Sequence, residues 1–166
     1  MRCSIIGFVG TTDGMTSEQL KTFQMLMEKE GRNTILHHGD LIGAGIQAHV
    51  AAKRLGCRTV LHPDIVEDFR AYCHNATGAW EPTNSDERND DIVDCCNHLI
   101  AAPKEMEEQR NQIWTTIRYA IQIHKQVTVI WPNGSTESIV TLPLKVNREV
   151  KNVSGKYLGQ NKECKQ

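Results

Sequence analysis

Apolar runs alternate with amphipathic stretches along most of the chain. Residues 4–10 are apolar at almost every position and end in Gly10 and a polar turn, a pattern typical of a strand buried on both faces. Thr16 and Gln19 then have the spacing of a capping box, and apolar residues follow on one helical face until Gly31. The same alternation predicts further strands at residues 34–38, 58–62, 98–102 and 127–131, and further helices near 46–55, 65–72, 85–96 and 113–124.

Strands that are apolar throughout and alternate with helices predict an α/β domain. We expect a Rossmann-like parallel sheet of about five strands with helices on both faces. Residues 73–85 have no periodic pattern and are expected to form a loop, and residues 138–143 are a candidate edge strand. The domain is expected to cover residues 1–143. Residues 144–166 are polar and have no periodic apolar face, so we expect them to be an extension outside the core.

Composition narrows the function classes. The net charge of −1 lacks the basic excess of free nucleic-acid binders, so we do not expect nucleic acid as a partner. There is no secretory leader pattern and no apolar stretch near the ~20 residues that span a bilayer, which predicts a cytoplasmic protein without membrane contact. The six cysteines are scattered and have no metal-ligand spacing, so we expect free thiols and neither a metal nor another cofactor. The pattern leaves a homo-oligomer open.

Polar or glycine-rich loops follow four of the predicted strands. Open parallel sheets bind ligands outside the carboxyl ends of their strands, because helix N-termini there point N–H groups into the crevice. The loops are residues 10–14, 39–45, 103–114 and 132–135. For a single loop, tight turns explain the glycines equally well, but four together favour a binding cleft. The glycine spacing matches neither the dinucleotide nor the triphosphate fingerprint.

Short motifs occur in a fixed order between residues 4 and 135. They are Gly7-Phe8-Val9-Gly10-Thr11 with Gly14-Met15-Thr16, His38-Gly39-Asp40 with Gly43-Ala44, His62-Pro63, Glu87-Arg88-Asn89 with Ile92-Val93, Leu99-Ile100-Ala101-Ala102-Pro103, Trp114-Thr115-Thr116-Ile117-Arg118-Tyr119-Ala120, and Trp131-Pro132-Asn133-Gly134. In this order they resemble motifs of the SLOG superfamily, in its bacterial and phage members.

The resemblance implies a Rossmann-like fold with a pocket for a nucleotide-type ligand, but not one reaction. The superfamily includes LOG-type nucleotide phosphoribohydrolases, which cleave a base from a nucleoside monophosphate, DNA-processing DprA proteins, and ligand-sensing domains of conflict systems. Together with the strand-end loops, it gives these candidate ligand contacts: Gly10, Thr11, Thr12, His38, Gly39, Gly43, Ala44, Arg88, Pro103, Arg110, Trp114, Thr115, Pro132 and Gly134.

Arg88 precedes Pro103 by an interval similar to that between an arginine and the Pro-Gly-Gly-x-Gly-Thr-x-x-Glu motif of LOG enzymes. The resemblance therefore implies that Arg88 contacts a phosphate or ribose, for which its planar fork is suited. The alternative is a solvated charge in the first turns of a helix. Trp114 and Trp131 have two open roles, stacking on a base or packing in the core.

The chain also departs from the LOG pattern. Residues 104–108 replace its glycines, and the LOG catalytic glutamate would fall at Thr115 or Thr116, which cannot act as a base. Thr12 stands where relatives usually have Arg, and Gly45 where they usually have Asp. These departures indicate a degenerate catalytic motif.

Cleavage of an N-glycosidic bond requires a carboxylate beside the sugar. The catalytic candidates by position are Asp40, Glu107 and Glu108, with helix capping as the alternative for Asp40 and solvent exposure for the glutamates. Adjacent strand residues point to opposite faces, so only one of His37 and His38 can face the cleft. His38 is the first candidate and His62 the second, with a structural histidine as the alternative for each.

Three functions follow, in this order. The first is a module that binds a nucleotide or nucleotide-derived ligand without turning it over. The second is a nucleoside-monophosphate N-glycoside hydrolase that uses a different carboxylate. The third is handling of single-stranded DNA like that of the DprA proteins.

Overall fold

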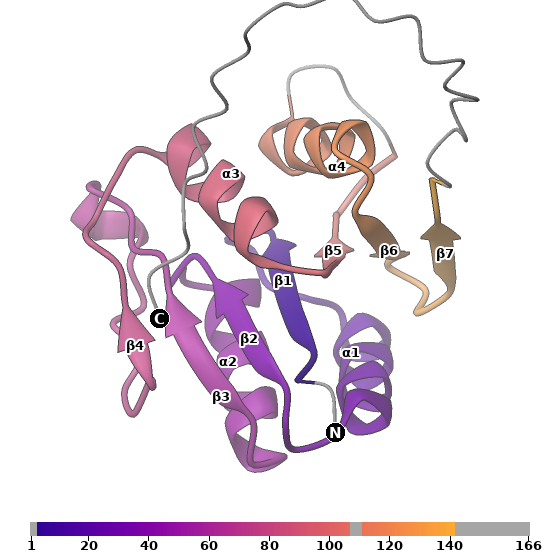
Figure 1. Cartoon of the computed structure of the whole chain (residues 1–166), viewed down its shortest axis with the longest axis horizontal. Coiled ribbons are helices and arrows are strands. Elements are labelled where there is room, and N and C mark those ends of the chain that lie inside the picture. The colour runs from indigo at the N-terminus through magenta and orange to yellow at the C-terminus, as the bar shows by residue number, and fades with distance from the viewer. Residues whose placement is uncertain (1–2, 107–110, 142–166) are drawn as a thin grey trace, which may run out of the picture.

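A computed structural model describes residues 3–106 and 111–141. Its centre is a seven-stranded sheet in the order β4-β3-β2-β1-β5-β6-β7 (Figure 1). All neighbouring strands are parallel except β6 and β7. The strands are β1 (Ile5–Gly10), β2 (Ile35–His38), β3 (Arg58–Leu61), β4 (Gly78–Ala79), β5 (His98–Ala102), β6 (Gln126–Ile130) and β7 (Thr136–Ile139), and the helices are α1 (Ser17–Glu30), α2 (Ala44–Arg54), α3 (Ser85–Cys95) and α4 (Gln112–Gln122), with a short 3₁₀ turn η1 (Glu67–Phe69).

Helices cover both faces of the sheet, as predicted. Alternate residues of β1 face opposite layers, so Phe8 packs with Phe23 of α1, while Val9 packs with Ile92 of α3. Figure 1 shows α1 and α2 on one side and α3 and α4 on the other. The predicted α/β class and Rossmann-like sheet are therefore confirmed, and helix N-termini meet at the carboxyl ends of the central strands.

The structure differs from the predicted elements at the edges of the sheet. The predicted loop at residues 73–85 contains β4, which pairs with the end of β3, and β7 begins earlier than the candidate strand at 138–143. With these two strands the sheet has seven rather than about five. Both additions are short and lie at or next to an edge, where exposed positions give little apolar signal.

The predicted helix at residues 65–72 is wrong, because this segment forms only η1. The 3₁₀ turn has a hydrogen bond of its own from the Arg70 N–H to the Glu67 carbonyl, but other backbone groups of the segment bond with the loop after β2. The Ile42 N–H donates to the Phe69 carbonyl, and the Ala71 N–H donates to the Asp40 carbonyl. Ile65 and Phe69 are exposed, so the segment has no buried apolar face of these residues. Tertiary hydrogen bonds have thus overridden the local pattern.

The predicted extension at 144–166 lies outside the described residues, so the domain boundary remains a prediction. None of the helices within 3–106 and 111–141 is long and apolar enough to cross a membrane.

Candidate ligand-binding site

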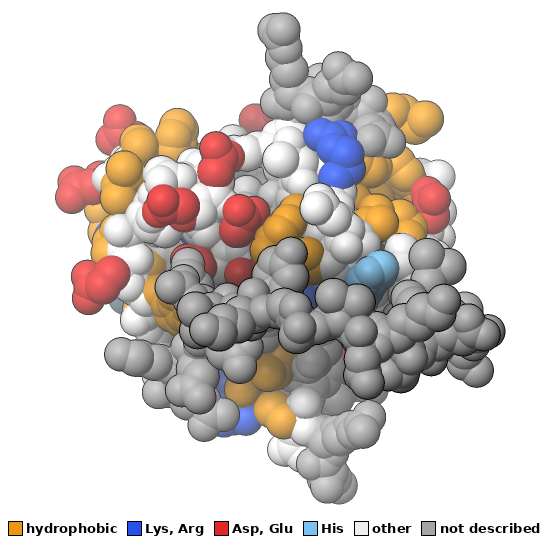
Figure 2. Space-filling view, turned by 45° about the horizontal axis from the view of Figure 1, so that its top comes forward, with side chains coloured by type: hydrophobic (Ala, Val, Ile, Leu, Met, Phe, Trp, Pro, Cys, Tyr) orange, Lys and Arg blue, Asp and Glu red, His pale blue; other side chains and the backbone are white. Residues whose placement is uncertain are grey.

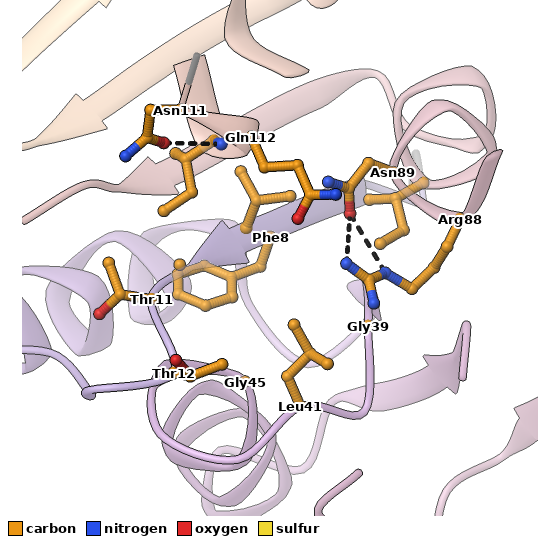
Figure 3. Close-up of a pocket in the computed structure, with 14 residues that line it drawn as sticks. Phe8, Thr11, Thr12, Gly39, Leu41, Gly45, Arg88, Asn89, Asn111 and Gln112 are labelled. Atoms are coloured by element: carbon orange, nitrogen blue, oxygen red, sulfur yellow. Dashed lines mark hydrogen bonds between the residues drawn. The ribbon is translucent and has the colours of Figure 1, made fainter. Parts of the chain in front are cut away.

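A cavity of about 250 Å³ opens at the carboxyl ends of β1 and β2, between α3 and the start of α4 (Figure 3). We call it the strand-end pocket. Its walls are Phe8, Val9, Gly10, Thr11, Thr12, Gly39, Leu41, Gly45, Arg88, Asn89, Ile92, Asn111, Gln112 and Ile113. The predicted contacts Gly10, Thr11, Thr12, Gly39 and Arg88 are therefore brought together from three separate segments of the chain.

Two glycines fix the loops under this pocket. A Cβ added to Gly10 would lie 2.5 Å from the Cβ of Ala44, so the residue allows α2 to approach β1. Gly43 has φ +75°, and a Cβ there would lie 2.2 Å from the carbonyl oxygen of Thr12. The Ala44 N–H donates to the Thr11 carbonyl at 2.9 Å. Gly43 and Ala44 therefore shape the pocket by joining its two loops, and neither is part of its walls.

Arg88 lies in the pocket wall and is buried, with 3% of its side chain exposed. Its Nη1 donates to Oδ2 of Asp64 at 2.5 Å, and its Nε and Nη2 donate to Oδ1 of Asn89 at 3.2 and 3.0 Å (Figure 3). Gly39 lets the backbone pass over the guanidinium, because a Cβ there would lie 3.1 Å from Nε. Burial lowers the pKa of Arg88, while Asp64 opposes that shift. The alternative of a solvated charge is wrong.

The start of α4 forms the opposite wall. Asn111 is the N-cap, and its Oδ1 accepts the N–H of Ile113 at 2.9 Å (Figure 3). Gln112 and Ile113 occupy the first turn, where backbone N–H groups and the helix dipole favour an anion. Among the described wall residues, Arg88 is the one charged side chain and none is a carboxylate.

Pro103, Pro132 and Gly134 lie outside the walls of the pocket. The amide of Gln19 donates to the Pro103 carbonyl at 2.9 Å, and the hydroxyl of Thr16 donates to the Pro132 carbonyl at 2.6 Å. Gly134 has φ +81°, and a Cβ there would lie 3.0 Å from the side chain of Glu18. These three predicted contacts join the start of α1 to the ends of β5 and β6.

Trp114 is a residue of α4, and its side chain is buried in the core, with its ring centroid 5.8 Å from that of Trp131. Its Nε1 donates to the Glu105 carbonyl at 3.3 Å. Core packing therefore describes Trp114 in this structure. Thr115 is exposed in a separate hollow beside Asp86, where its hydroxyl donates to the Asn111 carbonyl at 3.2 Å.

Asp40 is fully buried and has φ +53°. Its Oδ2 accepts from Nε of Arg70 at 3.2 Å, and its Oδ1 accepts the N–H of Cys73 at 2.8 Å. The carboxylate is not part of the pocket wall, and the N-cap of α2, Gly43, receives no side-chain hydrogen bond. Asp40 therefore holds the segment after β3 in place. The other predicted residues Glu107, Glu108 and Arg110 lie outside the described part of the chain.

His37 and His38 point to opposite faces of the sheet. On the α2 side, the Asp40 N–H donates to Nδ1 of His38 at 3.3 Å, Nε2 of His38 lies 3.0 Å from Nδ1 of His49, and Nε2 of His49 lies 2.9 Å from the His74 carbonyl. Burial, with smaller effects of neighbouring histidines, lowers the pKa of His38 to about 3. His38 is thus neutral and belongs to a closed hydrogen-bond chain behind the pocket.

On the α3 side, Nδ1 of His37 lies 2.8 Å from Nε2 of His62, and the ring of Trp80 lies 4.6 Å from that of His62. Burial lowers the pKa of His37 to about 4 and, with Arg88 and His37 as smaller causes, that of His62 to about 3. Both rings are therefore neutral at pH 7. Neither histidine belongs to the strand-end pocket.

The sequence prediction missed several residues of the site. Asn89 and Asp64 hold the guanidinium of Arg88, and Leu41, Asn111 and Gln112 line the pocket. Asp64 had a usable signal, because it follows a predicted strand and Pro63 directly, at the ligand-binding edge of the sheet. Asn111 also had one, since it precedes the apolar face of a predicted helix, as an N-cap does.

No family model and no curated protein sequence matches the chain. Several solved structures do match the chain. A molybdenum cofactor binding protein from Rippkaea orientalis is 21% identical with a TM-score of 0.61, and the match covers 79% of this chain and 78% of that one. The Moco carrier protein from Chlamydomonas reinhardtii is 20% identical with a TM-score of 0.60, covering 77% and 76%.

DNA processing protein A (DprA) from Streptococcus pneumoniae is 15% identical with a TM-score of 0.57, and the match covers 76% of this chain and 50% of that one. At such identities these likenesses concern the fold alone. The chain shares the Rossmann-like fold of these proteins, and DprA belongs to the superfamily that the sequence motifs resemble.

Proposed function

We propose that the protein binds a small anionic ligand of the nucleotide type in the strand-end pocket and does not turn it over. The observation that carries the proposal is the charge of the pocket wall. It contains a buried arginine, the first turn of α4 and glycine-lined backbone, and no carboxylate among its described residues. Asp64 already pairs with Arg88, so an anion would bind the guanidinium N–H groups that remain and the first turn of α4, and no carboxylate in the described wall would repel it.

Arg88 is suited to hold the anionic group. The three hydrogen bonds to Asp64 and Asn89 fix the plane of the guanidinium and use three of the five N–H groups that a guanidinium has. A phosphate at the pocket face of Arg88 would also lie near the N-terminus of α4. At about 250 Å³ the cavity is slightly smaller than most ligand pockets, which measure roughly 300–1,000 Å³, so we expect the phosphate and sugar inside and the base at the mouth.

The absence of turnover follows from the carboxylates. Cleavage of an N-glycosidic bond needs a carboxylate against the sugar, and Asp40 is occupied by Arg70 and the Cys73 N–H. Thr116, at one of the two positions expected for the LOG glutamate, is buried and donates to the Gln112 carbonyl. The hydrolase alternative therefore depends on Glu107 and Glu108, which lie outside the described residues.

The surface beside the pocket disfavours a nucleic-acid strand. The exposed side of α3 carries Asp86, Glu87, Asp90 and Asp94, and Figure 2 shows acidic side chains gathered on this side of the molecule. Partial desolvation against the helix and repulsion from the neighbouring aspartates raise the pKa of Asp90. A polyanion crossing the pocket would meet this charge, whereas a mononucleotide would not need to.

The test is a pair of substitutions at Thr12, which is exposed in the pocket wall and whose replacement leaves the Arg88 ion pair intact. Thr12→Asp adds a negative charge, and Thr12→Asn adds a neutral side chain of the same shape. AMP, CMP, GMP, UMP and molybdenum cofactor, the ligand class of two structural neighbours, are titrated against each protein. We expect at least about tenfold weaker binding to Thr12→Asp, or ~1.4 kcal/mol, and wild-type binding to Thr12→Asn.

Chromatography of the same mixtures measures free base. No release is expected. Equal affinity of the two Thr12 variants would refute binding in this pocket, and base release abolished by Glu107→Gln or Glu108→Gln would establish the hydrolase instead. Salt-sensitive retention of single-stranded DNA without nucleotide binding would favour the DprA-like function.

A further inference from the structure

A second cavity, of about 570 Å³, lies over the sheet face on the α3 side, away from the strand-end pocket. Its walls include His37, Val60, Trp80 and Cys95. Figure 1 shows that β3 and β4 have no described helix over them on this side. His37 lines this cavity and His62 lies behind it, 2.8 Å away between ring nitrogens; neither histidine has a role in the proposed function.

Three potential metal ligands meet there. One ring nitrogen of His37, one of His62 and the Sγ of Cys95 all lie within 4.8 Å of one another. They come from the end of β2, the residue after β3 and the end of α3, so the fold brings together side chains that are far apart in sequence. All three are at least half-buried, and Cys95 opens on the cavity.

The hydrogen bonds of the two histidines are incomplete. Nδ1 of His37 and Nε2 of His62 share one proton at 2.8 Å, and Nδ1 of His62 is buried without a hydrogen-bond partner. Either tautomer of His62 leaves a buried nitrogen unsatisfied, which is costly. Within the described residues, His62 therefore has one ring nitrogen whose hydrogen-bonding capacity is not filled.

A second group, His38, His49 and Cys73, has the same composition and serves as an internal comparison. There the nitrogens of His38 and His49 all have partners, running from the Asp40 N–H to the His74 carbonyl. The Cys73 thiol is hydrogen-bonded to the Asp40 carboxylate, which together with burial raises the pKa of Cys73 to about 12. This second group is complete without an ion.

We propose that His37, His62 and Cys95 form a Zn²⁺ site with an open fourth position that faces the cavity. Two imidazole nitrogens and one thiolate are the ligand types that Zn²⁺ prefers, and three protein ligands with an open position are typical of zinc that also binds a water or a small molecule. This inference revises the sequence-based expectation of no metal. Scattered residues give no ligand spacing, so only the fold reveals the group.

Binding requires small movements and one proton release. Tetrahedral bonds of about 2.0–2.1 Å place two nitrogens about 3.3 Å apart, so the rings must separate from their present 2.8 Å. The Cys95 thiol loses its proton to solvent as the sulfur–zinc bond forms. The proton that His37 and His62 share moves to the other nitrogen of its own ring, so both imidazoles bind through lone pairs and remain neutral. The charge of the ion is thereby partly neutralised by one thiolate.

The test uses full-length protein stripped with a chelator, in a Cys164→Ser background because that thiol lies outside the described residues. Titration with Co²⁺ should give one equivalent of a thiolate-to-metal charge-transfer band that Zn²⁺ displaces. We expect Cys95→Ser to lose the band and Cys73→Ser, the matched control from the complete group, to keep it. His62→Gln should weaken binding by about a hundredfold or more while the thermal melt shows a folded protein.

X-ray absorption at the zinc edge of the loaded wild-type protein is independent of any variant. It should show one sulfur at about 2.3 Å and two imidazole nitrogens at about 2.0–2.1 Å, with a lighter fourth ligand. A band that survives in Cys95→Ser, a band lost in Cys73→Ser, two or more sulfurs, or no stoichiometric binding at micromolar metal would each overturn the proposal. Nucleotide binding at the strand-end pocket stays unaffected in Cys95→Ser, so the two proposals fail separately.

Discussion

The buried pair of Arg88 and Asp64 offers the sharpest prediction of stability. Both side chains are almost fully buried, at 3% and 1% exposure, with 2.5 Å between Nη1 and Oδ2. Arg88→Met leaves the Asp64 carboxylate buried, with the Val66 N–H at 2.8 Å and the Ser85 hydroxyl at 2.6 Å as its other donors. Breaking such a pair costs about 3–5 kcal/mol of the free energy of unfolding. With ~2–4 °C per kcal/mol, the melting temperature should fall by roughly 6–20 °C.

A double-mutant cycle separates the pair from its surroundings. Asp64→Asn removes the charge at nearly constant volume, and the double variant removes both charges, so it should lose less stability than the sum of the single variants. We expect a coupling energy of about 2 kcal/mol or more, within the range for contacting residues. Urea denaturation followed by circular dichroism measures each free energy, with equal slopes as the control for two-state unfolding.

Two results would refute this reasoning. One is a cost of Arg88→Met below about 1 kcal/mol, the value for an exposed ion pair, and the other is strict additivity of the two substitutions. The cycle also isolates the binding role. If the double variant is folded, its loss of phosphate affinity measures the contribution of the Arg88 guanidinium to binding. Hydrogen bonds to charged groups are worth about 1.5–3 kcal/mol, so we expect the affinity to fall roughly 10- to 150-fold.

Three further measurements test the fold around the site. Gly43→Ala should cost about 1–3 kcal/mol in urea denaturation, because φ is +75° and the new Cβ meets the loop at 2.2 Å, whereas Gly78→Ala, with open space around it, should be nearly neutral. Burial holds the pKa of His38 at about 3, below its unfolded value. The contribution of His38 to the free energy of unfolding is therefore complete above about pH 6.5. As the pH falls below that value, only the unfolded state takes up the proton. Protein treated with a chelator should therefore lose on the order of 1 kcal/mol of its free energy of unfolding per pH unit from this group. A free energy of unfolding that stays constant between about pH 7 and 5 contradicts this. Burial raises the pKa of Cys96 to about 11, so mass spectrometry should find it unlabelled by a thiol reagent at pH 8 until denaturation, while exposed Cys3 reacts; equal rates would refute the packing.

The sequence was informative wherever burial alone decides structure. The strands β1, β5 and β6 are apolar on both faces, because helices cover both sides, and their runs predicted them. Prediction from the sequence failed where long-range hydrogen bonds decide the local structure. Ile65 and Phe69 have helical spacing, but the Ile65 N–H donates to the Thr83 carbonyl and the Phe69 carbonyl accepts the Ile42 N–H. The two residues of β4 are too few to carry a periodic signal.

The site was predictable in part for the same reason. Residues that follow strands can be placed at the edge of a parallel sheet from their order alone, and the predicted contacts Gly10, Thr11, Thr12 and Gly39 do line the pocket, together with Arg88 of α3. What order cannot provide is the partner of each side chain. Asp40 and Asp64 both follow a strand, yet one holds Arg70 and the other holds Arg88 beside the pocket.

The two groups of histidine and cysteine differ in the partners of their side chains. His37 and His38 are neighbours in sequence, and each meets one further histidine and one cysteine on its own face of the sheet. In sequence the two sets are equivalent. They differ because the Asp40 N–H completes the set around His38, while the set around His37 faces a cavity and leaves a nitrogen of His62 unpaired. A metal ligand set is therefore distinguished from a structural one by its hydrogen bonds, and residue types alone do not decide between them.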